Sequence, residues 1–411
     1  MSWLFPFAYP VSIDRGRILA FLNSVTLSLL LVFMVFDTLK PIVNLIYLIC
    51  LVGLPLLITR HRDFVSRHKV LFISVAVFVL YHEVHLYLVM GELSKDYLKH
   101  LALLLYFSSL SLYGFCRITL YVSVLMGSLL AAGMAGVAYF PAGGRVGLGF
   151  NPNVLGLILA VLSALNLACF LQEESRLRYA FILTFLAVAL AALTTGSRNV
   201  WLIELFLVAI LVIRLLRMST IGIKGVATLM GVGVLAALVT PGVAGKRMDS
   251  TLKEIQQITQ GKLNTSLGYR IQMIDMGMEL FQLRPVFGAG KDKSVQLELL
   301  QPMIDDKGYT RRAIKNFDHF HNGFIDELAK FGLMGFGSLA FLFLGIMRTA
   351  FQLRTALATG CLLGVYLIGA VGDSPLSNSR PEILLVFLVP LVLCLQKYRV
   401  LSAEPFRRRQ E

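Results

Sequence analysis

The chain has 411 residues, of which 57% are hydrophobic and only 15% charged, and its mean hydropathy is +0.74. Because roughly a quarter of a soluble domain is charged, this composition predicts a membrane protein with several spans. The formal charge of +14 does not indicate nucleic-acid binding, since the basic residues lie at the ends of apolar runs rather than in a stripe interleaved with aromatics. The cysteines lie in or beside apolar runs, which predicts buried thiols without a disulfide framework.

Apolar runs that approach the roughly 20 residues needed to cross the hydrocarbon core recur along the chain. They cover residues 18–36, 41–59, 70–90, 98–115, 118–140, 153–171, 179–193, 200–216, 225–240, 332–350, 355–371 and 382–396. The first run lacks a cleavage-site pattern, so it is expected to stay as a span. The sequence therefore predicts an all-α polytopic membrane protein with about 12 transmembrane helices.

The basic residues predict the orientation. If the N-terminus is cytoplasmic, the connections on its side hold nineteen Lys and Arg residues, and the short connections opposite hold six. Cytoplasmic loops carry the excess of positive charge. Both termini are therefore expected in the cytoplasm, with residues 241–331 on the outer side.

Residues 241–331 form a long polar interval that cannot lie in hydrocarbon, because unpaired polar groups cost several kcal/mol each there. It is predicted to be one large helical periplasmic loop between helices 1–9 (residues 1–240) and helices 10–12 with a basic tail (residues 332–411). Apolar spacing predicts helices at 251–259, 267–283 and 316–331. Pro285 and the glycines that follow predict a tight turn at 284–290.

Three arginines lie on the short outer connections, where positive charge opposes the topology rule: Arg145, Arg198 and Arg380. Arginine near a bilayer tends to be paired or functional, although snorkelling to lipid phosphates is the simpler alternative. Arg198 follows Gly196 and Ser197 at a predicted helix start. Helix amides together with a guanidinium form a good phosphate site.

Arg270, next to Tyr269 in the long interval, offers a second guanidinium. Two arginines that converge on one diphosphate would anchor a substrate and neutralise the charge that grows on a phosphate leaving group. The sequence alone does not bring Arg198 and Arg270 together, so their convergence is a hypothesis.

His319 and His321 flank Phe320 near the end of the long interval. On the predicted helix their rings diverge by about 200°, so only one of them would face a given cleft. Neighbours such as Asp318 and Asn322 could orient one ring as a general base, because the pKa of histidine lies near neutrality. A histidine without a catalytic role is the alternative.

No metal site is expected. The predicted divergence of His319 and His321 disfavours chelation, and the Asp305–Asp306 pair is expected in a linker. His82 and His85, with Glu83 in the third predicted span, are interpreted as a satisfied buried pair.

Several motifs together resemble the O-antigen ligases of bacteria. His321-Asn322, nine residues, then Gly332-Leu333-Met334-Gly335 matches their H-[NSQ]-x9-G-x-x-G pattern. Thr195-Gly196-Ser197-Arg198 resembles an arginine-bearing short loop of the superfamily. Gly268-Tyr269-Arg270 and the 285–290 turn resemble features of its long loop.

The resemblance implies a membrane-embedded glycosyltransferase that uses a lipid-linked donor. Such an enzyme would move O-antigen from undecaprenyl diphosphate to the lipid A–core oligosaccharide at the periplasmic face of the inner membrane. It would invert the anomeric carbon and need no metal or other cofactor. By carry-over, Arg198 and Arg270 hold the diphosphate. Further binding candidates, without a stated counterpart in the family, are Ser197, Tyr269, Asn322, Arg145, Arg380 and His319. His321 would activate or position the acceptor hydroxyl.

Three alternatives stay open. An O-antigen polymerase or a protein O-oligosaccharyltransferase of the same superfamily would use a similar donor with another acceptor. A secondary transporter could also have twelve spans, but its substrate site is expected near the membrane midplane. The polar residues of this chain are instead concentrated at one face.

Overall fold

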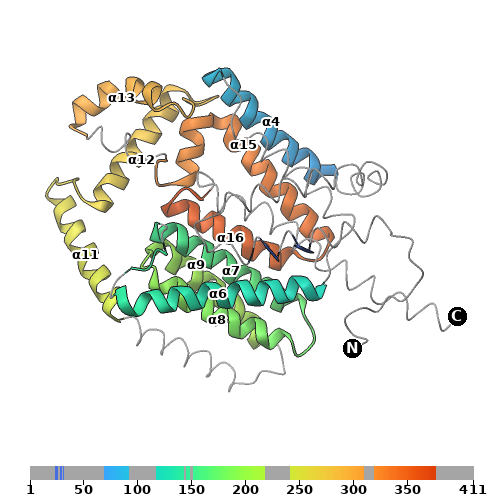
Figure 1. The fold of residues 1–411 in the computed structure, drawn as a ribbon. Helices are drawn as coiled ribbons and strands as arrows, with labels where there is room; N and C mark the ends of the chain where they lie inside the picture. Colours follow the sequence, from blue (N-terminus) through green and yellow to red (C-terminus); the bar gives the residue numbers. More distant parts are fainter. Residues whose placement is uncertain are drawn as a thin grey trace.

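The computed structural model describes residues 24–25, 28–29, 31, 69–91, 117–142, 145–148, 151–217, 241–309 and 319–375. In these ranges the secondary structure is helical, without strands (Figure 1). The helices are α4 (Lys69–Met90), α6 (Arg117–Ala142), α7 (Pro152–Gln172), α8 (Arg178–Thr194), α9 (Arg198–Leu216), α11 (Pro241–Thr259), α12 (Ser266–Leu283), α13 (Lys293–Lys307), α15 (Gly323–Gln352) and α16 (Ala356–Gly372).

Within the described ranges, α4, α6, α7, α9 and α15 are long and apolar enough to cross a membrane, and α8 and α16 are shorter apolar helices. The prediction of a polytopic helical membrane protein is confirmed at this level. Apart from five residues of the first, the runs predicted at 18–36, 41–59, 98–115, 225–240 and 382–396 lie outside the described residues. The total of twelve spans and their orientation stay predictions.

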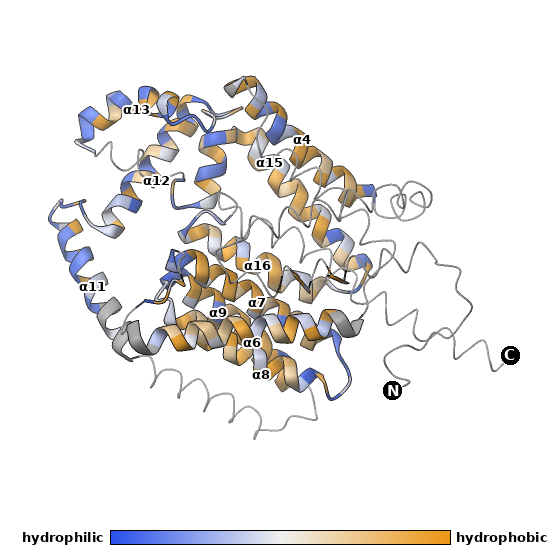
Figure 2. Ribbon diagram, in the orientation of Figure 1, coloured by the Kyte–Doolittle hydropathy of each residue, from blue (hydrophilic) through white to orange (hydrophobic). Residues whose placement is uncertain are grey.

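The apolar helices pack around α7. Its side chains from Leu155 to Phe170 are all buried, as expected for a helix that is hydrophobic on every side. Helices α6, α8, α9 and α16 surround it (Figure 1). Figure 2 shows that these helices are largely hydrophobic, whereas α11 and α13 of the long interval are largely hydrophilic.

The long interval has its own apolar core, which we call the second core: Met273, Met276, Leu280, Ala289, Leu300, Met303, Ile304, Phe320 and Ala329. It joins α12 and α13 to the start of α15. The predicted helix at 267–283 is confirmed as α12, whereas α11 begins ten residues before the helix predicted at 251–259. The linker predicted around Asp305 and Asp306 is wrong, since both residues lie in the last turn of α13.

The helix predicted at 316–331 begins later than expected. α15 starts at Gly323, after Asn322 caps it with hydrogen bonds from the amides of Phe324 and Ile325. It continues to Gln352 with one break at Gly332, where φ is +66°. The predicted boundary between the loop and the tenth span thus falls at a break within one helix.

The turn at 285–290 satisfies the backbone groups that the break exposes. The amides of Ala289 and Gly290 donate to the carbonyls of Ala329 and Lys330, over 2.8 and 2.9 Å. In the other direction, the amides of Leu333 and Met334 donate to Pro285 and Val286. Buried backbone groups need such partners, so the turn and the break stabilise each other. The Gly332 backbone lies so close to Val286 and Gly288 that a Cβ atom would overlap them.

Candidate functional site

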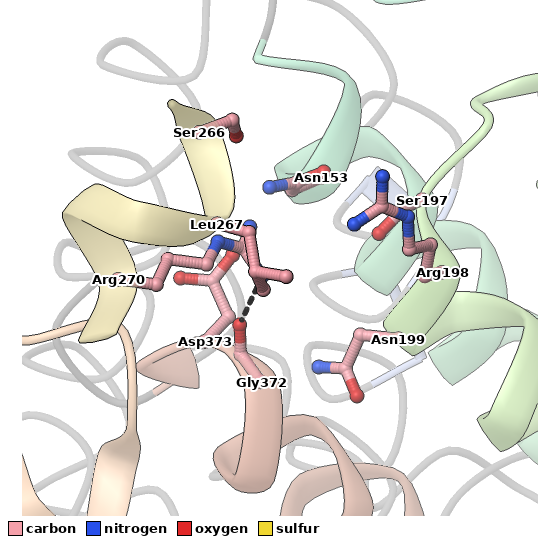
Figure 3. Close-up of a pocket in the computed structure, with 9 residues that line it drawn as sticks. All are labelled: Asn153, Ser197, Arg198, Asn199, Ser266, Leu267, Arg270, Gly372 and Asp373. Atoms are coloured by element: carbon pink, nitrogen blue, oxygen red, sulfur yellow. Dashed lines mark hydrogen bonds between the residues drawn. The ribbon is translucent and has the colours of Figure 1, made fainter. Parts of the chain in front are cut away.

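A small polar cleft lies where the ends of α7, α9, α12 and α16 meet (Figure 3). It is lined by Asn153, Ser197, Arg198, Asn199, Ser266, Leu267, Arg270, Gly372 and Asp373. Figure 3 shows the side chains of Arg198 and Arg270 on opposite sides of this space. The structure thus brings together the two arginines that were singled out from the sequence.

Arg198 is the first residue of α9. The chain reaches it through Gly196, whose φ of +61° suits glycine. Ser197 occupies the N-cap position without a side-chain capping bond. The first amides of a helix lack partners within the helix and favour anions. The start of α9 therefore offers amides and a guanidinium to the same cleft.

Arg145 fixes this helix start from the neighbouring connection. Its Nε donates to the carbonyl of Thr195 over 2.9 Å, and an Nη donates to Oδ1 of Asn153 over 2.8 Å. The amide of Val146 also donates to Thr194. Arg145 was predicted to bind substrate. In the structure it holds the loop before Arg198 and orients Asn153, which itself lines the cleft.

The C-terminal end of α16 joins the remaining elements of the site. Its last carbonyls have no partner within the helix, and side chains from three other elements supply donors. Asn199 donates to Gly369 over 2.7 Å, Asn322 to Val371 over 3.1 Å, and Arg270 to Gly372 over 3.0 Å. Arg270 is also attracted by the partial negative charge of this helix end. Arg270 is thereby placed beside the cleft.

His319 and His321 precede α15 and are not on a helix, so the prediction that their rings diverge is wrong. Their ring centroids lie 4.5 Å apart. Between them Phe320 is buried in the second core, and its amide donates to Asp326 over 3.0 Å. His321 has a left-handed backbone with φ of +53°, a conformation that histidine adopts more readily than most residues. This turn directs both rings to the same side.

Both rings meet Asp373, the residue that follows α16. Oδ1 of Asp373 lies 3.1 Å from Nε2 of His319 and 3.4 Å from Nδ1 of His321. Burial would raise the pKa of Asp373, but the hydrogen bonds from His319 and His321 outweigh it and hold this pKa well below its usual range. Asp373 is therefore a carboxylate at neutral pH.

Asp373 connects the cationic cleft with the two histidines, because it lines the first and contacts the second. Neither Asp373 nor the asparagines of the cleft was predicted from the sequence. An acid directly at the end of an apolar helix was the available signal for Asp373, since such residues are costly there. Asn153 and Asn199 carry no signal of that kind.

The other predicted residues have different positions. Tyr269 packs against the second core and is not among the residues that line the cleft. Asn322 caps α15, and Arg380 lies outside the described residues. His82 forms a buried pair, as predicted, but its partner is Glu327 of α15, 2.6 Å away, rather than His85.

The fold and the cleft define a helical, multi-pass membrane protein with a cationic polar site at the ends of its apolar helices. A family model described as O-antigen ligase matches residues 182–340. This region runs from α8 into α15 and includes Arg198, Arg270 and His321, but not Asp373.

Two known proteins are similar to parts of this chain. A protein called O-antigen ligase from Escherichia coli (strain K12) is 22% identical over 257 residues, which cover 62% of this chain and 59% of that protein. An uncharacterized protein from Haemophilus influenzae is 29% identical over 178 residues, which cover 42% of this chain and 43% of the relative. The chain thus spans about half of the length of these relatives. The findings confirm the resemblance to the O-antigen ligase superfamily.

Proposed function

We propose that the protein is an O-antigen ligase, which transfers a glycan from undecaprenyl diphosphate to a sugar hydroxyl of the lipid A–core oligosaccharide. The similarity to the O-antigen ligase superfamily and the cationic cleft support this proposal. The observation that carries it is the meeting of Arg198 and Arg270 in one cleft, next to a carboxylate that holds two histidines.

In the proposed reaction, the acceptor oxygen attacks the anomeric carbon of the first donor sugar. The bond between this carbon and the diphosphate oxygen breaks, and the electron pair leaves with undecaprenyl diphosphate. Attack opposite to the leaving group inverts the anomeric carbon. The acceptor proton passes to His321, which releases it to water after the transfer.

The two arginines would act on the leaving group. Among the described residues, no ion pair joins Arg198 or Arg270 to an acid. Their charges are therefore available for the diphosphate. Arginine presents a planar fork that matches two phosphate oxygens. Cations fixed where negative charge develops are a strong source of rate enhancement, so the leaving group needs no metal ion or acid catalyst.

Asp373 would set the tautomer of His321. A carboxylate near Nδ1 favours the tautomer with the proton on Nδ1, which leaves the lone pair of Nε2 to accept a proton. The acceptor hydroxyl would approach from the side of Nε2. The arginines would then bind the diphosphate, and His321 would accept the proton of the acceptor hydroxyl.

The proposed location follows from the predicted orientation. The connections that build the cleft are those predicted on the outer side, so the site would face the periplasm from the inner membrane. The donor's polyprenyl chain would stay in the membrane while its diphosphate enters the cleft.

The test is a transfer assay with the purified protein in liposomes, a polyprenyl-diphosphate-linked glycan and lipid A–core acceptor. We expect the acceptor to gain the glycan without an ion gradient or added metal. Glycan repeats joined to each other would instead indicate an O-antigen polymerase, and glycan on protein would indicate a protein O-oligosaccharyltransferase. Donor movement without a new glycosidic bond would indicate a transporter.

A further inference from the structure

We propose that His319, His321 and Asp373 form a binding site for one divalent transition-metal ion of the Zn²⁺ class, and that the bound ion inhibits the enzyme. The inhibitory half of this proposal rests on the proposed function, whereas the binding half does not. The three ligand atoms lie within 4.8 Å of one another and come from two separate parts of the chain.

The spacing of these atoms fits a tetrahedral ion. Nε2 of His319 lies 3.2 Å from Nδ1 of His321, and Oδ1 of Asp373 lies 3.1 and 3.4 Å from these nitrogens. Bonds of about 2.0 to 2.1 Å at tetrahedral angles separate neighbouring ligand atoms by about 3.3 to 3.4 Å. The triangle therefore has nearly the dimensions of one face of a zinc coordination tetrahedron.

Hydrogen bonds alone cannot account for all three contacts between these ligand atoms. Each ring nitrogen carries at most one hydrogen, and the carboxylate carries none. At most two of the three short contacts can then be hydrogen bonds. If both nitrogens donate to Asp373, the two N–H groups also face each other. An ion at the centre uses a lone pair from all three atoms at once.

The ligand types select the kind of ion. Imidazole nitrogens suit Zn²⁺, Cu²⁺ and Ni²⁺, whereas Mg²⁺ and Ca²⁺ prefer oxygen ligands. Two histidines and one carboxylate would leave the fourth position for water. The site is also reachable, because the side chains of His319 and Asp373 are 26% and 23% exposed.

The surrounding structure holds the ligands in place. Phe320, between the histidines, is buried in the second core, and Asn322 caps the helix that follows. The amide of Ser374 donates to Oδ1 of Asp373 over 2.9 Å. Such outer contacts orient metal ligands and raise affinity. A His-x-His segment outside a helix thus allows the chelation that the predicted helix disfavoured.

Metal binding would oppose the proposed chemistry. An ion on Nδ1 of His321 requires the ring proton on Nε2. Nε2 then has no lone pair with which to accept the acceptor proton. Zinc would therefore inhibit transfer by fixing the wrong tautomer, and a chelator would restore it.

The binding test uses Co²⁺ as a spectroscopic probe on the full-length protein in nanodiscs. We expect one equivalent of Co²⁺ with the visible absorption of a tetrahedral site, displaced by Zn²⁺. His319→Ala and Asp373→Asn should each weaken binding by roughly 10- to 100-fold or more, because each removes a ligand. Asp275→Asn, which changes a partly exposed carboxylate paired with Lys307, is the matched control and should bind Co²⁺ normally.

Thermal unfolding keeps the test decisive if a variant folds poorly. Ligands that bind the native state raise its stability, so Zn²⁺ should raise the Tm of the wild type and of Asp275→Asn. It should not raise the Tm of His319→Ala or Asp373→Asn variants that unfold cooperatively without metal. No Co²⁺ binding by the wild type, or equal binding by these two variants, would overturn the site.

The activity arm separates this proposal from the proposed function. We expect Zn²⁺ to abolish transfer by the wild type, and a chelator to restore it. Acceleration by Zn²⁺ would overturn the inhibitory half. Binding of Zn²⁺ with unchanged transfer would also overturn inhibition, and with it the role of His321 as a base, but would leave the metal site intact.

Discussion

A guanidinium nitrogen of Arg270 donates to the carbonyl of Gly372 over 3.0 Å and ties α12 of the long interval to the end of α16. The next residue, Asp373, lines the same cleft and contacts both histidines. Gly372 and Asp373, two consecutive residues, thus contact both α12 of the long interval and the proposed base His321. A change at either end of this connection should affect the site as a whole.

The first prediction concerns the two arginines of the cleft. Arg198→Lys and Arg270→Lys should each lower transfer by about 10²- to 10³-fold, because lysine keeps the charge but lacks the planar fork. Both variants should still reach the membrane in normal amounts. Initial rates in liposomes measure the effect, and Arg284→Lys, an exposed residue at the end of α12, is the control. Near-normal transfer by either cleft variant would mean that a diffuse positive field is enough.

A second prediction separates chemistry from positioning at His321. His321→Asn should lower turnover by about 10²- to 10⁴-fold if His321 accepts the acceptor proton. Asparagine is the best replacement, because it tolerates the positive φ of this position. Donor binding should remain, since the arginines provide it. If His321→Gln keeps most of the turnover, the residue only positions the acceptor by a hydrogen bond.

The third prediction tests Asp373, which was not expected from the sequence. Asp373→Asn should lower turnover by roughly 10²-fold, because an amide no longer favours the Nδ1–H tautomer of His321. The KM for the donor should change much less than kcat. Asp275→Asn should behave like the wild type. A variant at Asp373 with a raised donor KM and an unchanged kcat would assign this residue to donor binding instead.

A fourth prediction addresses the break in α15. Gly332→Ala should destabilise the protein and lower transfer, since the φ of +66° strains any side chain and a Cβ would overlap Val286. The backbone strain alone costs about 1–3 kcal/mol. Gly337→Ala is the matched control, because it lies in the same helix with open space around it. Equal thermal unfolding of the two variants would show that the break tolerates a side chain.

The sequence predicted the apolar helices well because membrane crossing requires long apolar runs. Helices α6 to α9 begin and end within two residues of their predicted bounds. It predicted the surroundings of His321 poorly, because the apolar spacing of Phe320 and Phe324 suggests a helix on both sides of Asn322. The side chain of Asn322 ends that pattern by capping α15.

The sequence predicted the arginines of the site but not the contacts between distant residues. Arg198 was found because a positive charge on a short connection predicted on the outer side opposes the topology rule. Arg270 was found as a second guanidinium in a motif that resembles the long loop of the superfamily. The contacts of Arg145, Asn199 and Asp373 join residues far apart in the chain, and no local pattern reports such contacts. The convergence of the two histidines depends on the positive φ of His321. The residue type alone does not predict this backbone conformation.

The most direct measurement of the central claim is an experimental structure of the protein with a polyprenyl-diphosphate-linked sugar bound. We predict the diphosphate between the guanidinium groups of Arg198 and Arg270, within hydrogen-bonding distance of both, near the first amides of α9. The anomeric carbon should face the side of His321. A diphosphate bound outside this cleft, or held by neither arginine, would contradict the account.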